Sequence, residues 1–138
     1  MTARQWLGRA RGIDREIDML LRAKRETRDR LLKITQSYVK DSVSGSKDPH
    51  KFDQLIEIEN TIDQRVDALL AVKQEISEAI TQKIKDWRQR QVLYCYYVRC
   101  ISMEQIAVEQ KYSYRQVRRF HRAGLEEFES TLQKGDGL

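Results

Sequence analysis

Apolar side chains recur at helical spacing along two long segments of the chain. Across residues 6–38 they fall mostly three and four positions apart, which is the repeat of one helix face. The same spacing resumes over residues 52–84. Between the two segments, residues 41–50 are polar and contain the only proline of the chain, Pro49. The pattern therefore predicts two long helices joined by a loop.

Two amphipathic helices of similar length cannot both leave their apolar stripes in water. We therefore expect them to pack antiparallel, as a helical hairpin that behaves like a coiled coil and occupies residues 1–85. An isolated hairpin also leaves apolar flanks. For this reason we expect self-association, in the form of a homodimer.

The remaining residues, 86–138, predict three shorter helices. The first covers 86–99 and carries a thick aromatic and aliphatic face. Ser102 is a candidate N-cap for a short helix that ends near Gln110, and Ser113 is a candidate N-cap for a longer one. A turn of three or four residues between the last two helices is typical of a helix-turn-helix. The expected fold class is all-α, with a hairpin followed by a three-helix helix-turn-helix domain.

Composition and motifs exclude several classes of protein. The 138 residues suffice for one domain or two small units, and no stretch is apolar for long enough to cross a membrane. No apolar signal segment follows the N-terminus, so we expect a soluble, cytoplasmic protein. Two cysteines and two histidines are too few for a metal site, and no phosphate-binding glycine loop or nucleophile motif occurs. We expect no enzyme activity, cofactor or metal.

The chain has a net charge of +5, and the excess of bases is local. Residues 113–125 contain four arginines and no acid, whereas acids follow directly after them. Residues 1–33 hold ten bases against five acids, but the signs alternate, which is typical of a solvated helix surface. The distribution thus indicates one basic face, near the start of the last helix.

This basic face fits the recognition helix of a helix-turn-helix. With Ser113 as N-cap, the first turn holds Tyr114, Arg115 and Gln116, where such a helix meets base edges in the major groove. Arginine pairs with guanine, and glutamine pairs with adenine. Further arginines on the next turns can reach bases or phosphates: Arg118, Arg119 and Arg122. We expect these seven residues to bind double-stranded DNA.

The crossing of the last two predicted helices has a sequence pattern of its own. Where they cross, the first needs a small residue and the second needs a branched apolar residue that points back. Ala107 and Val117 stand ten positions apart and meet this need.

The stretch from Trp87 to Phe128 resembles region 4 of bacterial sigma factors. That region has the successive patterns R-x-V-L-x-x-R-Y, S-x-x-E-I-A and S-x-x-x-V-x-x-x-x-x-x-A-L-x-x-L. The positions in register here are Gln91-Val92-Leu93, Ser102, Ile106-Ala107, Ser113, Val117 and Ala123-Gly124-Leu125. Together with the N-terminal hairpin, the chain is similar to small phage and prophage regulators, including late-gene activators of the autolysin-regulator type. The resemblance implies a phage promoter as target and host RNA polymerase as partner.

Two departures and two alternatives accompany this interpretation. Lys111 stands where the family usually has glycine in the turn, so it must take a left-handed conformation or enlarge the turn. The chain also lacks sigma regions 2 and 3, which speaks against promoter melting by this chain alone. One alternative is a sigma-like interaction module that docks on RNA polymerase or a phage protein without reading DNA. The other is a small DNA-packaging subunit of phage terminase, which also joins a helix-turn-helix to a coiled coil.

Other side chains that could take part in chemistry are expected to have structural roles. Cys95 and Cys100 are expected to be small core residues without a redox role. His121, beside Arg122, is expected at the surface, where it could touch a phosphate. Three tyrosines are expected to pack with solvated hydroxyls: Tyr94, Tyr96 and Tyr97.

Overall fold

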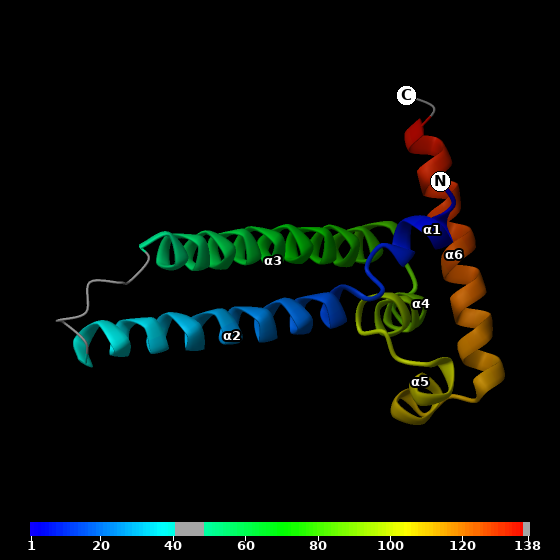
Figure 1. Ribbon diagram of the computed structural model, residues 1–138. Coiled ribbons are helices and arrows are strands. Elements are labelled where there is room, and N and C mark those ends of the chain that lie inside the picture. Colours follow the sequence, from blue (N-terminus) through cyan, green and yellow to red (C-terminus); the bar gives the residue numbers. More distant parts are fainter. Residues whose placement is uncertain (41–48, 137–138) are drawn as a thin grey trace. The chain divides into compact units, whose positions relative to one another are not determined.

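The computed structural model describes residues 1–40 and 49–136, and every regular element in these ranges is a helix. The all-α prediction is confirmed. In chain order the elements are α1 (Ala3–Gly8), α2 (Ile13–Lys40), α3 (Pro49–Lys83), α4 (Trp87–Leu93), the π-helix η1 (Tyr94–Val98), α5 (Met103–Gln110) and α6 (Tyr114–Asp136) (Figure 1). None of the described helices combines the length and apolar character needed to cross a lipid bilayer. Residues 41–48 of the predicted loop lie outside the described residues.

The prediction of one continuous helix over residues 6–38 is wrong at its start. The helix is interrupted between α1 and α2. There Gly12 has a φ of +87°, a left-handed conformation that glycine adopts without steric cost. The apolar period does not register this break, because Leu7, Ala10 and Ile13 keep a three-residue spacing and are all buried. The glycine was therefore the only sequence signal for the turn.

Two other helix boundaries differ from the predictions. Helix α3 begins at Pro49, three residues earlier than expected, because proline fits the first position of a helix. The predicted helix 86–99 is N-capped by Asp86, whose carboxylate accepts from the Arg88 amide at 2.9 Å. Its second half is the π-helix η1, and the chain then turns at Cys100, where φ is +57°.

Residues 15–69 form one compact unit, in which α2 and α3 lie side by side (Figure 1). Few of its side chains are buried, among them Thr27, Ile62 and Leu69. The ion pairs between the two helices connect them in antiparallel order: Lys24–Asp63 at 2.7 Å, Arg28–Glu59 at 3.1 Å and Arg65–Glu16 at 2.9 Å. Because exposed ion pairs are worth little, this unit depends mainly on its narrow apolar seam.

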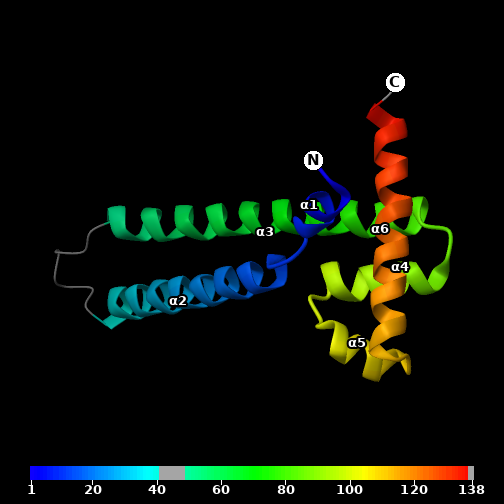
Figure 2. The same cartoon turned by 90° about the vertical axis from the view of Figure 1, so that its right-hand side faces the viewer.

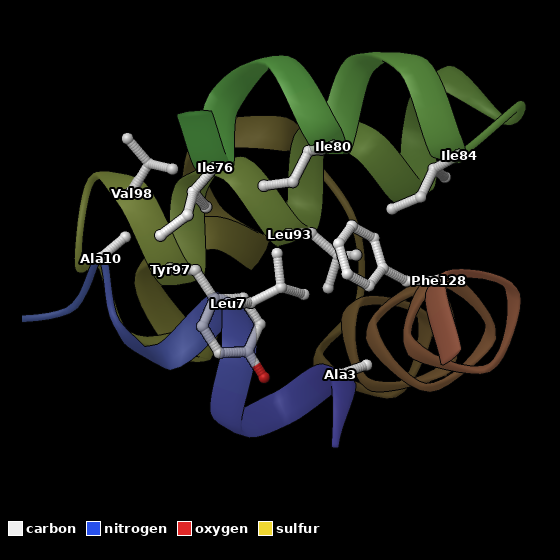
Figure 3. Packing of buried hydrophobic residues seen from close by; sticks show 10 residues of the cluster. All are labelled: Ala3, Leu7, Ala10, Ile76, Ile80, Ile84, Leu93, Tyr97, Val98 and Phe128. Atoms are coloured by element: carbon white, nitrogen blue, oxygen red, sulfur yellow. The ribbon is translucent and has the colours of Figure 1, made fainter. Parts of the chain in front are cut away.

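A second compact unit joins residues 1–14 to residues 70–138. The predicted boundary between the two parts of the chain lay after residue 85. The second unit instead includes α1 and the end of α3, because both pack with the C-terminal helices. Their apolar residues share one core (Figure 3): Ala3, Leu7, Ala10, Ile76, Ile80, Ile84, Leu93, Tyr97, Val98 and Phe128. The spacing of four residues keeps Ile76 and Ile80 on one face of α3, and Ile84, directly after the helix, continues this line because its amide donates to the Ile80 carbonyl at 3.3 Å.

Helices α4, α5 and α6 meet around a smaller apolar cluster. Its buried members are Val92, Cys95, Ile106 and Val117. Ala107 packs against this cluster, so Ala107 and Val117 come together as their spacing predicts. Figure 2 shows α6 passing α4, with α5 beside the start of α6.

Helix α6 approaches α4 closely at Gly124. A Cβ atom at this position would lie 2.9 Å from Cδ1 and 3.2 Å from Cγ of Leu93. Leu93 is completely buried and cannot move aside without disturbing the core. Gly124 is therefore required by packing.

The variant Gly124→Val should lower the free energy of unfolding by about 1 to 3 kcal/mol, the usual cost of overpacking a core. The control is Gly8→Val, where an added Cβ meets no atom within 4 Å, and its expected change is within about 0.5 kcal/mol. Urea unfolding of both variants measures the difference. Equal losses would contradict the close approach of α4 and α6.

Candidate nucleic-acid interface

The start of α6 is fixed by a reciprocal cap. The Ser113 hydroxyl accepts from the backbone amide of Gln116 at 3.1 Å. In return, Oε1 of the Gln116 side chain accepts from the backbone amide of Ser113 at 3.0 Å. This confirms Ser113 as a capping residue. Gln116 therefore has a structural role as well as the predicted role in contacting DNA.

The turn before this cap depends on Lys111. Its φ of 59° and ψ of 41° are left-handed, so the first of the two predicted outcomes is correct and the turn is not enlarged. The following amide, that of Tyr112, donates to the Ala107 carbonyl at 3.0 Å and closes the end of α5. Three residues thus separate α5 from α6.

The four predicted arginines lie on one exposed face of α6. Arg115, Arg118, Arg119 and Arg122 follow the spacing i, i+3, i+4, i+7, which aligns side chains along a helix. The side chain of Tyr114 is exposed beside them, with the Arg118 guanidinium 5.9 Å from its ring centroid. Of the seven predicted residues, these five lie together.

These side chains line a groove of about 1010 Å³ within the unit of residues 1–14 and 70–138. Tyr96, Tyr97 and His121 also line it, and Glu126 is the only acid among the lining residues. Ser113 and Gln116 are not part of the lining. Six arginines line the groove: Arg4, Arg11, Arg115, Arg118, Arg119 and Arg122.

The groove arginines differ from the other arginines of this unit in their partners. Arg90 donates to the carbonyls of Ile84 and Lys85. The others pair with acids: Arg9–Glu75 at 3.5 Å, Arg88–Asp86 at 3.2 Å and Arg99–Glu109 at 3.3 Å. Within residues 1–40 and 49–136, none of the six groove arginines has an acidic partner. Their charge is therefore available to an external anion.

Arg4 and Arg11 were not expected at this site, because their part of the sequence was interpreted as a solvated helix surface. The Arg11 guanidinium lies 4.2 Å from the centroid of the Tyr96 ring. The excess of bases over acids in residues 1–33 was a signal for them. However, no sequence pattern connected that segment to α6.

His121 is buried, so the prediction of a surface histidine is wrong. Its Nε2 is 3.1 Å from the Tyr97 hydroxyl, and the two rings stack with centroids 5.6 Å apart. The prediction of a solvated hydroxyl is therefore wrong for Tyr97, whereas Tyr94 is exposed. The spacing of Val117, His121, Gly124 and Phe128 along α6 was the available signal, because it continues the buried face.

Burial governs the ionisation of this pair. It lowers the pKa of His121 to about 4, and the nearby charges of Arg4 and Arg11 act in the same direction. Burial also raises the pKa of Tyr97, against the effect of the Arg4 charge. Both side chains are therefore neutral at pH 7, and the arginines supply the positive charge of the groove.

The remaining candidate groups form no second site in the described residues. Cys95 is buried, as expected, whereas Cys100 is exposed, so the prediction of a core residue is wrong at that position. Its side chain leaves the core because the backbone turns at this residue. Residues 1–40 and 49–136 contain no group of three or more His, Cys, Asp or Glu side chains able to hold a metal ion.

The low pKa of His121 should make stability depend on pH. Because the unfolded chain binds this proton more readily, the free energy of unfolding should fall as the pH drops below about 6.5, down to about 4. The contribution of His121 amounts to at most about 3 kcal/mol. Urea unfolding between pH 7 and pH 4 should show a flatter profile for His121→Gln than for the wild type. Parallel profiles would mean that His121 titrates normally in the folded chain.

Comparison of the chain with family models, curated proteins and solved structures finds no match. The features of this chain that bear on its function are therefore the groove, its arginines and the turn that positions α6.

Proposed function

We propose that this protein is a sequence-specific DNA-binding regulator of the phage type, which reads the major groove with the first half of α6. In this proposal residues 15–69 form a helical hairpin, and α4, α5 and α6 form a helix-turn-helix. The observation that carries the proposal is a set of four arginines on the exposed face of a capped helix, none of which has an acidic partner in the described residues. Such a face meets both base edges and phosphates when the helix enters the major groove.

The connection between α5 and α6 supports the proposed helix-turn-helix. A recognition helix must be held at a fixed angle, and the left-handed Lys111 and the Ser113 cap fix both sides of the turn. The buried contact partners Ile106 and Val117 hold the two helices together behind the turn. The arginines then point away from this packed face.

The resemblance to sigma region 4 and to phage late-gene activators supports a further part of the proposal. We propose that the protein binds near a promoter and acts together with host RNA polymerase. A sigma-like module that docks on a protein without reading DNA is the main competing function. It would use the same arginines against an acidic protein surface, so binding to duplex DNA at low salt decides between the two.

Arg115 is expected to contact a base. Arg115→Ala should lower the affinity for the specific site by about 1 to 3 kcal/mol and change the affinity for random duplexes little. A matched control is Arg25→Ala, which removes an exposed arginine of α2 and should change neither affinity. Selection of bound sequences from a random pool supplies the specific duplex. Equal losses on specific and random DNA would assign Arg115 to phosphate contact only.

Gln116 allows capping and DNA contact to be separated. Gln116→Glu keeps an acceptor for the Ser113 amide, since glutamate also completes a capping box. However, it cannot donate to adenine and it repels phosphates. It should retain the stability of the wild type and lose DNA affinity, whereas Gln116→Ala should lose both. Thermal unfolding and DNA titration measure the two effects, and wild-type affinity of Gln116→Glu would exclude a base contact.

The hairpin is proposed to join two copies of the chain. Large apolar side chains are exposed on it, including Met19 at 62%, Leu32 at 58% and Ile58 at 47%. A symmetric dimer would require an operator with two-fold symmetry and half-sites roughly 10 base pairs apart, or a multiple of that. Two copies would thus cover the apolar surface and provide a paired binding site.

Sedimentation at micromolar concentrations should show a dimer. Changing Met19, Leu32 and Ile58 to lysine should yield a monomer, because charges do not tolerate burial at an interface. Gln64→Lys, at another exposed position of the hairpin, is the control and should remain dimeric. A wild-type monomer that binds a single half-site would contradict the proposed assembly.

A further inference from the structure

The N-terminal segment is held against α6 by several contacts. The Ala3 amide at the start of α1 donates to Glu129 of α6, so a carboxylate occupies the positive end of a helix. Leu7 is completely buried in the same core as Phe128. Figure 1 shows α1 beside α6, and Figure 3 shows Ala3 and Leu7 facing the α6 residue Phe128. The segment is therefore a fixed part of this unit.

These contacts determine where Arg4 and Arg11 lie. Residues 4, 8 and 11 of the chain all line the groove, together with the arginines of α6. Both side chains are exposed, and neither has an acidic partner among the described residues. Arg11 is positioned by its contact with the Tyr96 ring at 4.2 Å. The N-terminal segment thus adds two positioned cations to the basic groove.

We propose that Arg4 and Arg11 bind phosphates of the DNA duplex whose bases α6 contacts. This inference rests on the proposed function. A helix that enters the major groove is flanked by both sugar-phosphate backbones, and cations beside it meet phosphates rather than base edges. Arginine suits this role, because its guanidinium binds phosphate in a bidentate manner. Arg4 and Arg11 therefore increase affinity for every sequence and fix the position of the helix on the duplex.

Two double variants with equal loss of charge test the role. Arg4→Gln with Arg11→Gln removes the two groove cations. Arg15→Gln with Arg22→Gln removes two exposed arginines of α2 that lie outside the groove and have no acidic partner in the described residues. A third variant, Arg4→Lys with Arg11→Lys, keeps the charge. Affinity for a random and a selected duplex is measured as a function of salt concentration for all three and the wild type.

The expected readout is the salt dependence of binding. Each lost phosphate contact should flatten the slope of log K against log salt by about 0.9, so the groove variant should lose about 1.8. Its affinity at 0.1 M salt should fall by roughly eightfold per arginine on both duplexes. The control variant and the lysine variant should keep slopes close to that of the wild type.

A measurement on the wild-type chain makes the test independent of variant folding. Phenylglyoxal modifies exposed arginines, and mass spectrometry locates the modified positions. The duplex should protect Arg4 and Arg11 and leave Arg15 reactive. Unprotected Arg4 and Arg11, or an unchanged slope in a folded groove variant, would overturn the inference while wild-type DNA binding still stood. Failure of the wild type to bind any duplex at low salt would instead overturn the proposed function.

Discussion

The arrangement of the C-terminal helices depends on the buried face of α6. Val117, His121, Gly124 and Phe128 lie along this face, and each meets a different neighbour. Val117 packs in the cluster shared with α5, His121 bonds Tyr97, Gly124 admits Leu93, and Phe128 joins the core with Leu7. One helix stripe thus fixes the positions of α1, α4 and α5 around it.

The opposite face of α6 gains its character from this packing. Since the helix repeat separates the two stripes, the arginines between positions 115 and 122 cannot turn toward the core. These side chains all carry the same charge, so they cannot neutralise one another. Elsewhere in the same unit arginines are paired with acids or carbonyls, as Arg99 is with Glu109. The arginines on this face of α6 have no acidic partner in the part of the chain that the structure describes, so their mutual repulsion costs stability.

Local features of this fold were predictable, and long-range ones were not. Ser113 as a cap and the meeting of Ala107 with Val117 follow from spacings within about ten residues. For Lys111 the sequence left two outcomes open, and the structure shows the left-handed one. The position of Arg4 and Arg11 depends on tertiary contacts between segments more than 100 residues apart, such as Ala3 with Glu129. Periodicity carries no information about which helix a distant segment will cover. The wrong prediction for His121 has a different cause. Its polar side chain indicated a surface position, whereas its place in the apolar repeat of α6 indicated burial.

The neutral His121, which lines the groove, affects how the charge of the groove depends on pH. Arginine side chains stay charged at physiological pH. His121 is neutral there, because burial lowers its pKa to about 4. The groove consequently carries the same positive charge at mildly acidic and at mildly alkaline pH. Dissolved salt screens this charge, so the attraction of the groove for an anion weakens as the ionic strength rises and stays nearly constant over that range of pH.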